Sequence, residues 1–403
     1  MNILLVVQHF PPNAGGGRAY RAAKLVKHLS RSGCRVAVVC SDATLDGDSS
    51  LLEGADMSRV KILRCKEPEG FFRITFAKIC GHLCFANGMY LLAWRLIDTA
   101  MKTQIGFIPD VVITSSAPYE VHFVGMFLKK RFGIPWIADF RDPYTLNYNY
   151  RKISPLGGSA DRWLEKQIYK IADGVIFNTY HNRLESSRAF GLPAQSNRFT
   201  VCQNGYDSDD ISPINQRIDS KPFNISYIGG VRGDATERAF VSSVLQHAKT
   251  LRAEQVRFRF IGNGSEVFSY EAERSGGVIE TVAFCPQERL RRYWDESDAL
   301  LLMLPPAVGY LGWVPQKIYS YLRTGLPVMA LLPNGEARDY LMEAGVHVVA
   351  FPGETDIPGM IRALRSRAGE RNTNTTDTGQ SAKFNQRLLF EDLLEWMRSL
   401  LCQ

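Results

Sequence analysis

Hydrophobic positions fall in short continuous runs that are separated by longer amphipathic stretches. In the first half of the chain, these runs predict strands at residues 3–7, 35–40, 110–114, 136–139, 174–178 and 199–202. Between the first two runs, residues 18–31 carry apolar side chains at helical spacing, which predicts a helix with one buried face. Continuous apolar strands that alternate with helices indicate a parallel sheet covered on both faces.

The same pattern restarts near Phe223, with predicted strands at 223–228, 256–261, 278–284, 299–304, 327–331 and 347–351. Residues 208–222 are rich in Asp, Ser, Pro and Asn, and they form the expected linker. The sequence therefore predicts an α/β fold of two tandem Rossmann-like, doubly wound domains. We expect domains at 1–212 and 213–383, followed by a helix at 384–403 that returns toward the N-terminal domain.

The length of 403 residues fits two such domains, and 45% hydrophobic with 22% charged residues excludes a disordered chain. The net charge is +7, and residues 1–212 hold all of the excess, with 26 basic and 19 acidic side chains. This asymmetry favours an anionic partner of the first half, such as a membrane, a phosphate-bearing substrate or a nucleic acid. The alternative is a scattered, solvated surface.

The eight cysteines form no CxxC pair, which favours free thiols in a reducing compartment over disulfides or a zinc site. The first seven residues are typical of a strand and lack the basic start of a signal peptide. Residues 79–94 carry no Lys, Arg, Asp or Glu, but this stretch of 16 residues is too short for a transmembrane helix. We therefore expect a cytoplasmic protein.

Three segments at predicted strand ends carry candidate chemistry. Gly15, Gly16 and Gly17 stand between a strand and a helix, where a glycine loop can approach a phosphate, although a flexible connection is the alternative. His122 follows the strand at 110–114 and could contact a sugar, although a lone histidine is more often structural.

Charged residues also leave the strand at 136–139, in the segment ADFRDPY. Asp139 and Arg141 lie at its end, where we expect the rim of a ligand site. An ion-paired turn is the alternative.

Several segments, in this order, resemble the retaining nucleotide-sugar glycosyltransferases of glycosyltransferase family 4. They are FPPNAGGGRAYRAAKLVKHLSRSGCRVAVV, WIADFRDPY, ADGVIFNTY, CQNGYD, ISYIGG, FRFIGNGS and WVPQKIYSYLRTGLPVMAL. They span nearly the whole chain. The resemblance implies the GT-B fold, in which two Rossmann-like domains face a central cleft.

The resemblance also implies roles for single residues. The glycines at 15–17 would approach the donor diphosphate and the acceptor, and His122 would be the cleft histidine near the transferred sugar. With Asp139 and Arg141, which we expect at the cleft rim, it forms the predicted catalytic set.

On the donor side, Gly229 and Gly230 would admit the nucleotide. Arg232 and Lys317 would supply positive charge to its diphosphate.

Two positions depart from the family pattern. Many members carry Glu where this chain has Gly312 and Ser320, and Ser320 stands where a carboxylate would bind the ribose. A lysine usual after the phosphate arginine is also missing, and Arg238 could serve instead. These departures keep open the alternative of a binding protein without turnover. A sugar-nucleotide epimerase, which has the same two-domain layout, is the other alternative.

For the mechanism, the sequence offers no convincing pair of nucleophile and base. The resemblance implies front-face displacement, in which the leaving phosphate takes the proton of the acceptor. Because no Asp-x-Asp metal site is recognisable in a suitable loop, we expect metal independence and no cofactor besides the nucleotide-diphosphate sugar used as donor.

Residues 60–105 interleave bases with aromatic side chains, and Arg73, Lys78 and Arg95 are among these bases. Such a stretch can lie in a membrane interface, and a pair of helices packed into the core is the alternative. Nucleic acid is not expected, because no known binding module accompanies the charge. We expect a glycan or polyprenyl-linked acceptor, peripheral membrane contact and a role in building cell-surface polysaccharide or lipopolysaccharide.

Overall fold

The computed structural model describes residues 1–12, 17–42, 49–66, 90–102, 105–147, 150, 154–193, 195–210, 214, 222–284, 287–306, 311–344, 347–368 and 381–402. The chain divides into two compact units, which are residues 1–204 with 386–403, and residues 205–385. The division follows Asn204, whereas the sequence places it after residue 212. The last helix belongs to the first unit, as expected.

The first unit contains a seven-stranded sheet of order β3-β2-β1-β4-β5-β6-β7, in which every pair is parallel. Its strands are β1 (Asn2–Val6), β2 (Arg35–Ser41), β3 (Val60–Cys65), β4 (Val111–Ser115), β5 (Trp136–Phe140), β6 (Gly174–Phe177) and β7 (Phe199–Val201). Strand β3 was not predicted. It is an edge strand with exposed polar side chains, so it lacks the continuous apolar run of the central strands.

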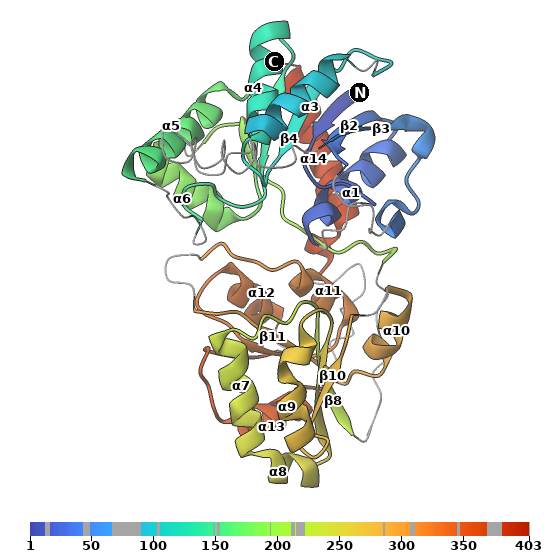
Figure 1. Ribbon diagram of the computed structural model, residues 1–403, viewed down its shortest axis with the longest axis vertical. Helices are drawn as coiled ribbons and strands as arrows, with labels where there is room; N and C mark the ends of the chain where they lie inside the picture. Colours follow the sequence, from blue (N-terminus) through green and yellow to red (C-terminus); the bar gives the residue numbers. More distant parts are fainter. Residues whose placement is uncertain are drawn as a thin grey trace. The chain divides into compact units, whose positions relative to one another are not determined.

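Helices cover both faces of this sheet. They are α1 (Gly17–Arg31), α3 (Tyr90–Lys102), α4 (Val121–Phe132), α5 (Pro155–Ile171), α6 (Tyr180–Phe190) and α14 (Gln386–Leu401). Apolar residues of α3 to α6 pack on one face, and those of α1 and α14 pack on the other. Figure 1 shows α14, in red, among the elements of the first unit, and it contacts α1 directly.

The second unit contains a six-stranded parallel sheet of order β10-β9-β8-β11-β12-β13. Its strands are β8 (Phe223–Ile228), β9 (Val256–Ile261), β10 (Ile279–Val282), β11 (Ala299–Met303), β12 (Val328–Leu331) and β13 (Val348–Ala350). Its helices are α7 (Ala235–Gln246), α8 (Ala248–Ala253), α9 (Ser269–Arg274), α10 (Gln287–Asp295), α11 (Lys317–Thr324), α12 (Glu336–Ala344) and α13 (Ile357–Ala368). The predicted class of two tandem, doubly wound α/β units is confirmed.

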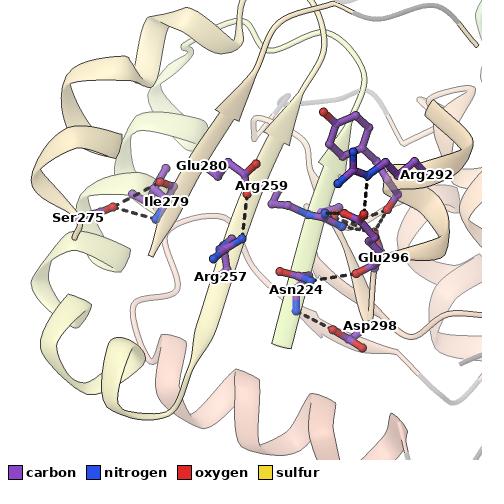
Figure 2. A network of polar contacts seen from close by, with 12 residues as sticks. Asn224, Arg257, Arg259, Ser275, Ile279, Glu280, Arg292, Glu296 and Asp298 are labelled. Atoms are coloured by element: carbon purple, nitrogen blue, oxygen red, sulfur yellow. Dashed lines mark hydrogen bonds and ion pairs between the residues drawn. The ribbon is translucent and has the colours of Figure 1, made fainter. Parts of the chain in front are cut away.

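A polar network joins the middle of the second sheet to the end of α10 (Figure 2). Arg259 of β9 is buried, and its guanidinium donates to Glu296 Oε2 at 2.9 Å and to Ser226 Oγ at 3.1 Å. It also donates to the Tyr293 carbonyl at 3.1 Å. This buried cation is therefore matched by a carboxylate and by the carbonyl end of a helix.

Within the described residues, no helix combines the length and the apolar character needed to cross a bilayer.

Candidate functional site

In both sheets the direction of strand order reverses once, between β1 and β4 and between β8 and β11. Parallel α/β sheets bind ligands at such switch points, beyond the carboxyl ends of the strands. In the second unit, residues 229–233 follow β8, and α11 follows β11 through residues 304–316. The topology therefore brings Gly229, Gly230, Arg232 and Lys317 to the same edge of one sheet.

The turn after β8 packs backbone to backbone against the turn after β9. Gly229 has φ +131° and Gly262 has φ +134°, a region that side chains other than glycine rarely adopt. A Cβ atom on Gly262 would lie 2.4 Å from the Gly229 carbonyl oxygen. The Val231 amide donates to the Asn263 carbonyl at 2.8 Å, so the two turns form one tightly packed ledge.

Glu237 fixes this turn from beneath. It lies in the first turn of α7, is buried, and accepts from the backbone amides of Arg232 at 2.9 Å and Gly233 at 2.7 Å. Its other oxygen accepts from the Tyr227 hydroxyl at 3.0 Å. These three hydrogen bonds satisfy the buried carboxylate and hold the turn in one conformation.

Lys317, the first residue of α11, presents its ammonium to this ledge. Its Nζ lies 3.6 Å from the centroid of the Tyr227 ring, and a Cβ atom on Gly229 would lie 3.4 Å from it. No carboxylate of the described residues lies within ion-pair distance of Nζ. Loss of water around the ammonium lowers the pKa of Lys317 to about 7; the charge of Glu237 opposes this shift and that of Arg232 adds to it.

The other predicted donor residues lie nearby. Arg232 is exposed, with its guanidinium carbon 6.0 Å from the centroid of the Trp313 ring. A methyl group on Gly230 would meet no atom within 4 Å, so the space above it is open to a ligand. Arg238 is exposed and donates to the Gly233 carbonyl at 2.8 Å. Ser320 is partly exposed, one turn after Lys317 on the same helix.

In the first unit, Asp139 is buried in an ion pair. Its carboxylate accepts from Arg21 of α1 at 3.0 and 3.1 Å and from Ser115 Oγ at 2.7 Å. Burial is the largest single influence and alone would lower the pKa of Arg21, but the charge and hydrogen bonds of Asp139, together with the contribution of Cys202, raise it. Arg21 also donates to Asn204 Oδ1 at 3.1 Å, so the pair ties α1 to two strand ends.

His122 is buried at the start of α4. Its Nδ1 shares a hydrogen bond of 2.8 Å with Thr114 Oγ1, which also accepts from the Trp136 indole at 2.8 Å. The His122 ring lies 4.7 Å from that of Phe140. Because this aromatic environment excludes water, burial lowers the pKa of His122 to about 3, so the imidazole is neutral.

The remaining first-unit candidates are placed in part. Arg141 directly follows β5 and is partly exposed, and burial lowers its pKa. Gly17 begins α1, while Gly15 and Gly16 lie outside the described residues. The catalytic assignment of His122, Asp139 and Arg141 stays a prediction.

The basic stretch at 60–105 is described only at its two ends. Residues 60–65 form the edge strand β3, and α3 buries Leu96 and Ile97 in the core. Arg95 is exposed on α3, and Arg73 and Lys78 lie outside the described residues. The described part of α3 thus has the core-packing character of the alternative interpretation.

Sequence reasoning missed Tyr227, Glu237 and Arg21. Tyr227 belongs to an apolar strand, and Glu237 and Arg21 lie in helices that carry other charged residues, so none of them stands out in a linear pattern. Asp234 and Glu237 at the start of α7 form the one local signal, because acidic residues favour a first helical turn.

Comparison with known proteins agrees with this architecture. Residues 16–205 match the family described as glycosyl transferase 4-like domain. The amylovoran biosynthesis glycosyltransferase AmsK of Erwinia amylovora is 22% identical over 236 residues, which cover 53% of this chain and 53% of that protein. The match to this curated relative thus spans about half of its length.

Two solved structures are similar over the whole chain. Sucrose-phosphate synthase from Thermosynechococcus elongatus has a TM-score of 0.69 at 15% identity, covering 100% of this chain and 99% of that chain. The lipopolysaccharide outer core galactosyltransferase WaaB has a TM-score of 0.60 at 15% identity, covering 99% of each. At these identities the likeness shows the fold, which is the GT-B fold. The resemblance to glycosyltransferase family 4 is thus supported by a family match over residues 16–205.

Proposed function

We propose that this chain is a glycosyltransferase that moves a sugar from a nucleotide-diphosphate sugar to a glycan or lipid-linked acceptor with retention of configuration. The observation that carries the proposal is Lys317, whose ammonium stands against the glycine turn at the sheet's switch point without a carboxylate partner among the described residues. A cation left unmatched at such an edge is suited to an anionic ligand.

The electrostatics of the turn suit a leaving diphosphate. As the bond between the sugar and the diphosphate breaks, negative charge grows on the phosphate oxygens, and fixed cations stabilise it. Lys317 and Arg232 would supply this charge, and the open space above Gly230 would admit the phosphates. With two protein cations in this role, we propose transfer that does not depend on a metal ion.

For retention, we propose displacement on one face of the sugar. The bond between the anomeric carbon and the diphosphate oxygen breaks, the bond to the acceptor oxygen forms on the same face, and the acceptor proton passes to the departing phosphate. The protein then contributes mainly positioning and charge stabilisation. The neutral imidazole of His122 is suited to shaping the first unit and not to carrying a charge.

The names of the relatives support a role in surface polysaccharides. AmsK is named for amylovoran biosynthesis and WaaB for the lipopolysaccharide outer core. We infer that this chain acts in a comparable pathway, on a glycan or polyprenyl-linked acceptor, at the cytoplasmic side of a membrane with peripheral contact.

A thermal-shift panel with UDP-, GDP-, dTDP- and ADP-sugars tests the donor class. We expect one of them to raise the melting temperature of the wild type, and the shift to disappear in Lys317→Met. If none of the four binds, the proposed function is contradicted.

Ser320 favours a second candidate, a protein that binds the donor without turning it over, because a carboxylate expected at the ribose is absent there. Mass spectrometry of the acceptor separates the two. Transfer of a sugar supports the transferase, and donor binding without transfer supports the binding protein. Isomerisation of the donor without any acceptor would instead indicate an epimerase.

A further inference from the structure

Helix α5 buries both of its acidic side chains. Asp161 accepts from the hydroxyl groups of Tyr144 at 2.7 Å and Tyr150 at 2.6 Å, and Glu165 accepts from the Tyr169 hydroxyl at 2.9 Å. Both carboxylates are fully buried. The exposed face of α5 therefore carries no acidic side chain.

The exposed face of α5 is basic and apolar. Arg162, Lys166 and Lys170 are exposed at intervals of four residues, which places them along one side of the helix. On the same side, Leu156 is 64% exposed and Trp163 is 60% exposed. Large apolar side chains left this open among cations mark an interaction surface.

Helix α6 continues this surface. Tyr180 is 64% exposed, Leu184 is 45% exposed and Arg188 is exposed, again at intervals of four residues. The two helices lie side by side (Figure 1), and Arg162 donates to the Ala189 carbonyl of α6 at 3.1 Å. We define the α5–α6 face as Leu156, Arg162, Trp163, Lys166, Lys170, Tyr180, Leu184 and Arg188.

We propose that the α5–α6 face docks this protein onto an anionic lipid bilayer. Helices that lie in a membrane interface carry Trp, Tyr and Leu flanked by Lys and Arg, so that the apolar groups enter the headgroup region while the cations meet anionic lipids. Glu185, the acid of α6, is partly buried and lies outside this row. The proposal deepens the peripheral location proposed above by naming the surface.

The charge of the whole unit supports an anionic surface as the partner. The first unit holds 28 Lys and Arg against 19 Asp and Glu, whereas the second holds 20 against 22. A net +9 attracts an anionic surface over about a Debye length before any contact forms. The bilayer thus matches both the near contacts and the longer-range field of this unit.

Flotation of the full chain with vesicles tests the proposal. We expect binding to vesicles of equal parts phosphatidylcholine and phosphatidylglycerol, and little binding to phosphatidylcholine alone. Lys166→Glu with Lys170→Glu should lower the partition coefficient by at least about 25-fold, because each lost cation contributes about fivefold and each new carboxylate adds repulsion. The matched control is Lys249→Glu with Arg362→Glu, which makes the same charge change at exposed positions of the second unit.

Trp163 supplies an independent readout in the folded wild type. A quencher carried on the lipid should reduce its emission in anionic vesicles, and Trp163→Phe should lose that quenching. Equal binding to neutral and anionic vesicles, no vesicle binding, or an equal loss in the control pair would each overturn the proposal.

Donor binding by the two charge-reversed proteins, read by thermal shift, separates this surface from the proposed function. If the Lys166→Glu, Lys170→Glu protein still binds the donor but no longer floats with vesicles, the α5–α6 face serves membrane docking and is separate from the donor site.

Discussion

In the first unit Arg21 meets the carboxylate of Asp139, whereas in the second unit Lys317 meets the ring of Tyr227 and, in the described part of the chain, no carboxylate within ion-pair distance. Both cations stand near the carboxyl ends of strands, at the start of a helix. Arg259, deeper in the second sheet, is matched by Glu296 in the same way as Arg21.

The comparison teaches which charges serve the fold and which are left for a ligand. A buried cation with a carboxylate and further hydrogen bonds is electrically satisfied and holds elements together. A lysine whose ammonium has lost water without gaining a carboxylate destabilises the free protein, and it gains a charged partner only when an anion binds. The contacts of Arg21 raise its pKa, whereas burial lowers the pKa of Lys317 and also, despite the pairing with Glu296, that of Arg259.

The largest effect should come from breaking the matched pair. Asp139→Ala leaves Arg21 buried without its carboxylate, and we expect the free energy of unfolding to fall by about 3–5 kcal/mol. Urea denaturation measures this. The double change Arg21→Met with Asp139→Leu should cost less than Asp139→Ala, and a loss below about 1 kcal/mol in the single variant would contradict a structural ion pair.

Removal of a charged side chain in the second unit should instead raise the free energy of unfolding. Lys317→Met removes a crowded ammonium, so we expect stability to rise by about 1–3 kcal/mol while donor affinity falls by about 3 kcal/mol. Calorimetry and urea denaturation measure the two quantities. Lys249→Met, at an exposed position of α8, is the control that should change neither. Lost stability together with unchanged affinity would reverse the roles assigned to the two units.

Arg232→Ala should weaken donor binding by about 1.5 kcal/mol, the lower end for a charged hydrogen bond, because Arg232 is exposed to water. Its stability should change little. If the calorimetric affinity of Arg232→Ala is unchanged, Arg232 does not bind the diphosphate, and Lys317 is the remaining candidate of the two.

The smallest effect is expected for Tyr227→Phe. The ring beneath Lys317 stays, but Glu237 loses one of its three donors, which should cost about 1 kcal/mol of stability with a small effect on donor affinity. Tyr227→Leu removes the ring as well and should also weaken donor binding. Equal donor affinities of the two variants would argue against a role for the ring in placing Lys317.

The regular parts of the fold could be predicted because buried parallel strands are continuous apolar runs. The strand at 256–261 was predicted with its observed bounds, whereas β3 was missed because an edge strand exposes polar side chains. The meeting of Gly229 with Lys317, 88 positions apart, followed from the family resemblance. That Glu237 supports the turn and that Arg21 neutralises Asp139 depends on three-dimensional contacts, and neither leaves a periodic signal.

The pH dependence of donor binding tests the role of Lys317 most directly. Its pKa of about 7 in the free protein means that the cation is present below pH 7 and is lost as the pH rises. We measure calorimetric affinity from below to above that pKa, with whichever of the UDP-, GDP-, dTDP- and ADP-sugars gives the largest thermal shift. We predict that wild-type affinity falls by up to about tenfold per pH unit above pH 7, while Lys317→Met binds weakly at every pH without this fall. Identical pH profiles for the two proteins would contradict the claim that the ammonium of Lys317 binds the donor diphosphate.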